Sequence, residues 1–162
     1  MQAITLWPEW SWAILNLGKD VENRCWPLPP KLIGVALALH AGRNVGGQPG
    51  ARAYERGCAA LRQMAARAGH DPGPLAEWYT HMRRDLDAQA GAIVAVVRFG
   101  RSVRNSASHW AVPHEYHWPI AELFPLPHPV RCRGLQRLWP VPDEVDRMIR
   151  DQVPNPRGAA AQ

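Results

Sequence analysis

The chain has 162 residues, of which 46% are hydrophobic and 20% are charged, with a formal net charge of +5 and a pI near 9.6. This length suits one domain with a sizeable core, and no apolar run approaches the ~20 residues of a bilayer-spanning helix, which argues against a membrane partner. Three scattered cysteines argue against a disulfide framework or a zinc knuckle, and the first residues lack the pattern of a secretory signal, so we expect a cytoplasmic protein.

The first half of the chain combines short strands with helices. Three segments have the apolar pattern of strands, the second with period-two alternation: residues 4–7, 21–26 and 32–40. Three segments have the pattern of helices: residues from Pro8 onward, about 52–68 and about 75–89. Helical spacing in the last of these places three residues on one apolar face: Trp78, Met82 and Leu86. The glycine-rich residues 41–50 predict a loop.

The second half begins with the clearest strand, residues 92–97, in which branched apolar residues dominate. Residues 102–115 are predicted to form an irregular loop. Two further strands are predicted on either side of a proline-rich break at 124–129: residues 116–123 and 130–139. A helix is predicted from residue 143 to about 152, and we expect residues 154–162 to be a disordered tail.

These elements predict a single α+β domain over residues 1–153. Short strands of differing spacing, with helices gathered in the first two-thirds, indicate a small, partly closed mixed β-barrel of about five to six strands flanked by helices.

Lysine is scarce in this chain and one lysine stands in a compact polar run. Only two of the nineteen basic residues are lysines, and Lys19 opens the run Lys19-Asp20-Val21-Glu22-Asn23-Arg24. A lysine ammonium is a compact donor whose pKa falls readily on burial, whereas a guanidinium stays charged. Lys19 is therefore the first candidate functional residue, although a general compositional preference for arginine also accounts for the scarcity. Most of the excess charge lies in residues 98–137, which hold six arginines and two glutamates.

Four segments occur in an order that matches a known family: Leu6-Trp7-Pro8-Glu9-Trp10, Gly18-Lys19-Asp20-Val21-Glu22-Asn23-Arg24, Leu39-His40-Ala41-Gly42 and Arg133-Gly134-Leu135-Gln136-Arg137-Leu138-Trp139. With these segments the chain resembles the ASCH family, a branch of the PUA-like superfamily of small β-barrel domains. The family signature is glycine, any residue, lysine, two residues, glutamate, one residue and arginine. Lys19, Glu22 and Arg24 match it, whereas Leu17 holds the glycine position and Gly18 follows one place later.

The resemblance implies a PUA-like barrel with a cleft lined by this motif, and a role with RNA or another nucleic acid. In that interpretation Lys19 and Arg24 contact phosphate or base edges, and Glu22 accepts a hydrogen bond from a base amino or imino group. The alternative is an ion-pair ladder on an exposed edge strand, which contributes only ~0–1 kcal/mol to stability.

Further candidate nucleic-acid-binding residues lie outside the motif: Trp7, His40, Arg101, Arg104, Trp110 and Gln136. The two tryptophans are candidates for stacking on a base, with core packing as the alternative. His40 ends the third apolar strand, where a histidine satisfied within the core is the alternative. The arginines are expected to follow a nucleic-acid backbone.

Three histidines fall close together in the predicted loop and the strand that follows it: His109, His114 and His117. Zinc sites have tighter paired spacing than this. We therefore expect no metal and no cofactor.

Two functions follow from these residues. The first is a nucleic-acid-binding module that favours RNA or an unpaired or modified base held in the cleft, with affinity that falls steeply with salt. The second is a hydrolytic enzyme in which Lys19 acts as general base and Glu22 assists, either a ribonuclease or an acetylated-cytidine amidohydrolase. In the amidohydrolase relatives a threonine nucleophile stands where this chain has Glu22, and their further catalytic glutamate has no counterpart in residues 92–97, which disfavours deacetylation. A protein-interaction domain with an idle cleft is a third possibility, and the sequence identifies no protein partner.

Overall fold

The computed structural model describes residues 1–70 and 75–153, with the side chains of residues 75–79 excepted, so the predicted tail at 154–162 lies outside the described residues. The strands of the described chain are β1 (Gln2–Leu6), β2 (Val21–Arg24), β3 (Ala36–Ala41), β4 (Ala92–Phe99), β5 (Tyr116–Arg131) and β6 (Leu138–Pro140). The α-helices are α1 (Pro8–Asn16), α2 (Ala51–Arg67), α3 (Leu75–Gln89) and α4 (Asp143–Gln152). Two short 3₁₀ turns, Pro30–Leu32 and Val45–Gly47, precede β3 and α2.

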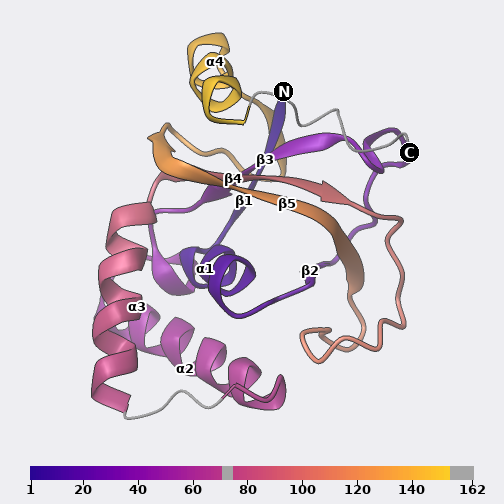
Figure 1. The fold of residues 1–162 in the computed structure, drawn as a ribbon. Coiled ribbons are helices and arrows are strands. Elements are labelled where there is room, and N and C mark those ends of the chain that lie inside the picture. The colour runs from indigo at the N-terminus through magenta and orange to yellow at the C-terminus, as the bar shows by residue number, and fades with distance from the viewer. Residues whose placement is uncertain (71–74, 154–162) are drawn as a thin grey trace.

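The six strands form one mixed sheet in the order β2-β5-β4-β3-β1-β6. β1 and β3 are parallel, with Ile4 opposite Leu39, and every other pairing in the sheet is antiparallel. The sheet curls into a half-barrel, and β5 bends through it along most of its length (Figure 1). The predicted α+β class, with a small curled sheet flanked by helices, is therefore confirmed.

The prediction of two strands separated by a proline-rich break at residues 124–129 was wrong. β5 runs through this region without interruption from Tyr116 to Arg131. Beyond Pro119 its second edge has no partner strand in the described chain, because β2 pairs only with residues 116–119. Proline lacks an N–H and is tolerated at such an edge. The register also shifts between the Ile93–Val130 and Ala95–Pro125 pairs, which leaves residues 126–129 in a bulge.

The helices lie at two ends of the sheet. α1, α2 and α3 gather at one end and α4 packs near the other (Figure 1). A core cluster between the helices contains Trp12, Leu61, Met82 and Leu86, and the predicted apolar side of α3 is confirmed for the last two. The side chain of Trp78, predicted on the same face, lies outside the described residues.

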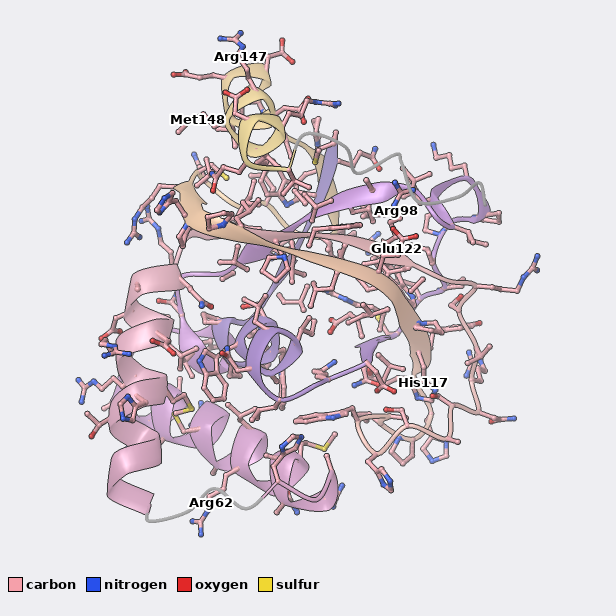
Figure 2. The ribbon with its side chains drawn as sticks, in the orientation of Figure 1. Arg62, Arg98, His117, Glu122, Arg147 and Met148 are labelled. Atoms are coloured by element: carbon pink, nitrogen blue, oxygen red, sulfur yellow. The ribbon has the colours of Figure 1, made fainter. Side chains whose placement is uncertain are left out.

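The sheet carries a second core cluster around Ile4, Leu39, Phe99 and Trp118, all of which are 0% exposed. At the edge of β4, Arg98 and Glu122 point toward each other, with Nε 3.2 Å from Oε2 (Figure 2). None of the helices in the described ranges is long and apolar enough to cross a membrane.

Candidate functional site

A pocket of about 560 Å³ opens between the edge of the half-barrel, α2 and the loop that precedes β5. Its volume lies within the range of about 300–1,000 Å³ that is usual for small-molecule sites. The lining residues come from four separate stretches of the chain: Thr5, Leu6, Trp7, Trp10, Lys19, Glu22, Asn23, Arg24, Ala60, Gln63, Met64, Arg67, Val112 and Glu115.

All three signature residues line this pocket and contact one another. Lys19 Nζ lies 3.3 Å from Glu22 Oε2 and also donates to the carbonyl of Val21. Arg24 Nε lies 3.0 Å from Glu22 Oε1, and Arg24 Nη2 donates to the Thr5 carbonyl at 2.9 Å. Both carboxylate oxygens of Glu22 are therefore held by cations of the same chain.

Burial separates this cluster from an ordinary surface ion-pair ladder. Lys19 is 3% exposed and Glu22 is 5% exposed. Burial lowers the pKa of Lys19 below its usual 10.5, and the neighbouring carboxylate of Glu22 opposes that change. The cluster is a desolvated network with a net positive charge, because two cations surround one anion.

The local sequence accounts for this arrangement. Gly18, in the left-handed conformation at φ 62°, ends α1 and turns the chain so that the Lys19 N–H returns to the Ala13 carbonyl at 3.2 Å. β2 begins two residues later and pairs antiparallel with β5, with Glu22 opposite Trp118. Because side chains alternate along a strand, Glu22 and Arg24 share one face.

One wall of the pocket is aromatic. Trp7 is 51% exposed and lies over Gly47, where a Cβ would come within 2.4 Å of the indole ring. Trp10 lines the same pocket. Behind this wall Glu9 is fully buried and its Oε1 accepts a hydrogen bond from the Gly46 N–H at 2.9 Å, which fixes the glycine loop. Burial raises the pKa of Glu9 above its usual 4.5.

The loop before β5 supplies the facing wall and is pinned at several points. Asn23 donates to the Trp110 carbonyl at 2.9 Å and accepts from the Val112 N–H at 3.0 Å. His117, at the lower end of β5 in Figure 2, accepts from the Ser106 N–H through Nδ1 at 3.2 Å, so its Nε2–H donates to the Val112 carbonyl at 2.8 Å. These bonds hold the part of the loop that carries Glu115.

Two of the predicted binding residues are buried away from the pocket. Trp110 is 3% exposed and packs in the core cluster between the helices, so its ring has no free face for a base. His40 is 2% exposed: its Nε2–H donates to the Cys132 carbonyl at 3.2 Å, its ring packs edge-on against Trp139, and Gly134 lies against it. At both positions the side chain packs in the core, which was the alternative to nucleic-acid binding.

The arginines predicted to follow a nucleic-acid backbone do not line this pocket. Arg98 is paired with Glu122, and Arg131 donates to the carbonyls of Ala90 and Ala88. Arg104 lies over the Tyr116 ring, 4.1 Å from its centroid. Arg101, Arg104 and Gln136 are exposed, and none of these three lines the pocket.

Several pocket residues were missed at the sequence level: Trp10, Asn23, Gln63, Arg67 and Glu115. The α2 residues at positions 60, 63, 64 and 67 share one helix face, since they follow the i, i+3, i+4, i+7 spacing. That pattern identifies a face, but only the docking of α2 onto the barrel edge places the face in the pocket. Asn23 and Trp10 belong to two of the family-like segments, but other residues of those segments were predicted to bind.

Within residues 1–70 and 75–153, no group of three or more histidine, cysteine, aspartate or glutamate side chains is placed to hold a metal ion. No protein-family model matches the chain, and no curated protein matches it.

Proposed function

We propose that this protein is a nucleic-acid-binding module of the ASCH type, which takes an unpaired base of a single-stranded RNA into the pocket beside Lys19, Glu22 and Arg24. One observation carries the proposal: the signature cluster and the exposed indole of Trp7 line the same pocket. Aromatic rings that stack on bases and cations that meet phosphates are the usual components of single-strand binding sites.

The size and charge of the pocket support this function. Three cations and two carboxylates line it, Lys19, Arg24 and Arg67 against Glu22 and Glu115, so its formal charge is 3 − 2 = +1. A pocket of about 560 Å³ has room for a base and its ribose. A weak positive charge favours an anionic strand, and the arginines of residues 98–137 do not line the pocket.

The test is binding of a fluorescently labelled single-stranded RNA of five nucleotides, followed by anisotropy from 25 to about 300 mM salt, a range in which counterion release weakens phosphate contacts. We expect binding at low salt that weakens as salt rises, and weaker binding for Trp7→Ala. Trp26→Phe is the control, because Trp26 is partly buried against the core cluster of the sheet and does not line the pocket. No binding at the lowest salt, or equal binding by wild type and Trp7→Ala, would contradict the proposal.

A hydrolytic activity is the second candidate, and the burial of Lys19 favours it. A lysine whose pKa is lowered by desolvation can act as general base. Its Nζ donates to Val21 and Glu22, so a proton must leave this network before the amine can accept one. The pocket offers Glu115 as a second carboxylate, but from the loop before β5 and not from β4, whose residues contain no acid.

Substitution of Lys19 separates the two candidates. Lys19→Arg keeps the positive charge and removes a titratable amine, because a guanidinium does not deprotonate in proteins. A binding module retains RNA affinity in Lys19→Arg and shows no turnover in wild type. A hydrolase cleaves short RNA or acetylated cytidine in wild type and loses that activity in Lys19→Arg while RNA binding persists.

A further inference from the structure

The carboxylate of Glu115 is the anionic acceptor of this pocket that no cation of the described chain holds. Glu115 is partly exposed and lines the pocket, and among the described residues its side chain makes no hydrogen bond or ion pair. Glu22, by contrast, has one oxygen on Lys19 and the other on Arg24. Glu115, and not Glu22 as predicted from the sequence, is therefore the residue available to accept hydrogen bonds from a base edge.

A free carboxylate restricts what can lie next to it. It carries two acceptor oxygens and no donor, so it repels phosphate and the acceptor atoms of a base. The strand backbone is therefore kept from the Val112–Glu115 wall, and the hydrogen-bonding edge of the base faces it. Arg24 and Arg67 also line the pocket, and Arg24 pairs with Tyr116, the residue next to Glu115, so these cations are left for oxygen atoms of the ligand.

Guanine is the base whose edge fits a carboxylate with a cation beside it. It presents an N1–H and an N2 amino group side by side, which can satisfy both oxygens of one carboxylate, and its O6 next to them is an acceptor for a cation. Adenine and cytosine present an amino group beside a ring nitrogen acceptor, and uracil presents one N–H between two carbonyls. Each of these three bases would place an acceptor against Glu115.

We infer that the pocket selects guanine, and that Glu115 determines this specificity by accepting hydrogen bonds from N1–H and N2 of the base. The inference rests on the proposed function, because it assumes that a base enters this pocket. Both carboxylate oxygens are used by guanine alone among the four RNA bases, so the discrimination should be about tenfold or more, as for other bidentate contacts between side chains and base edges.

The experiment measures binding of five pentaribonucleotides that differ only in the central base: UUGUU, UUAUU, UUCUU, UUUUU and UUIUU, in which inosine lacks the N2 amino group. Wild type should bind UUGUU about tenfold or more tightly than the other natural sequences, with UUIUU in between, since inosine keeps N1–H and O6. Glu115→Gln is the same size but presents an amide N–H₂ to the donor edge of guanine, so it should lose the preference for UUGUU and keep its affinity for UUAUU.

The matched control is Glu144→Gln, because Glu144 is exposed on α4, at the other end of the sheet from α2 (Figure 1). It should bind all five oligonucleotides as wild type does. Equal binding of the five sequences, a preference for another base, or a guanine preference that survives in Glu115→Gln would overturn the inference and leave the proposed function intact. Absence of binding to every sequence at low salt would overturn both.

Discussion

Arg24 Nε lies 3.0 Å from Glu22 Oε1, and the two side chains project from the same face of β2 into one pocket. Glu22 also holds Lys19 through its other oxygen, so a single buried carboxylate compensates two cations. The stability of this edge of the sheet depends on that one negative charge.

Glu22→Gln should destabilise the fold by roughly 3–5 kcal/mol at pH 7, because removing one member of a buried ion pair leaves an uncompensated charge. Loss of the carboxylate also lowers the pKa of Lys19 further, since Glu22 opposes the effect of burial more strongly than Asp20 does. A lysine whose folded pKa lies below its unfolded value destabilises the fold at low pH, and that cost disappears as the pH rises toward 10.5. In urea, the loss of unfolding free energy in Glu22→Gln relative to wild type should therefore be smaller at pH 10 than at pH 7.

The double variant Lys19→Met with Glu22→Gln provides the control for this prediction. It removes one cation together with the anion, so it should recover part of the stability lost by Glu22→Gln alone. If the double variant is less stable than Glu22→Gln by the full effect of Lys19→Met, the two side chains are not coupled.

Gly134→Ala should destabilise the protein by about 1–3 kcal/mol, the usual effect of overpacking. A Cβ at residue 134 would lie 2.2 Å from Cε1 of His40, and the ring is fixed between Trp139 and the Cys132 carbonyl. Gly100→Ala is the matched control, because its Cβ would meet nothing closer than 3.8 Å. Chemical denaturation of both variants checks the prediction, and equal midpoints for the two would contradict it.

The comparison with the sequence-based predictions turns on how local each signal is. β2, α2 and α4 could be predicted within a few residues because alternation or helical spacing marks them over their whole length. β5 could not, since its prolines indicate a break unless the missing partner strand beyond Pro119 and the bulge at residues 126–129 are known. The course of β5 therefore depends on its pairing with strands that are distant in the sequence.

The site divides in the same way. Lys19, Glu22 and Arg24 lie within one short segment, so strand geometry alone brings them to one place. Arg67 and Glu115 reach the pocket only when α2 and the loop before β5 dock against the barrel edge. The sequence leaves Trp110 ambiguous because an indole in an irregular basic loop suits stacking and core packing equally, and only the packing of that loop against the helices buries the ring.

Glu9→Gln should remove a pH-dependent loss of stability. Burial raises the folded pKa of Glu9 above the 4.5 of the unfolded chain, so this group favours the fold below pH 4.5, and its contribution is lost as the pH rises through the folded pKa. Gln keeps the acceptor for the Gly46 N–H and carries no charge. Each tenfold rise in the proton affinity of Glu9 corresponds to about 1.4 kcal/mol.

Melting temperatures from pH 4 to pH 8 measure this effect as the difference between variant and wild type. The melting temperature of the variant should rise relative to that of wild type as the pH increases. The effects of other titrating groups cancel in this difference. A difference that does not change with pH would mean that Glu9 has the same proton affinity in both states.

Trp7→Ala should weaken RNA binding by about 1–3 kcal/mol, the usual contribution of one stacked base. Trp7→Phe should retain part of that energy because a smaller ring still offers a face. Both variants should keep the wild-type free energy of unfolding in urea to within about 1 kcal/mol, as for exposed positions generally, since the side chain is half exposed. An equal loss of affinity in the two variants would show that stacking is not the contact made by Trp7.

The position of β1 in the sheet has a consequence for biosynthesis. β1 contains the first residues of the sheet, yet it lies between β3 and β6, and Gln2 pairs with Leu37 on one side and Pro140 on the other. While the ribosome is still adding the residues before 138, β1 has an unpaired edge, and closing so long a span of chain is slow. Thr5 and Leu6 at the other end of β1 line the pocket, so the strand that waits longest for its second partner also carries part of the ligand site.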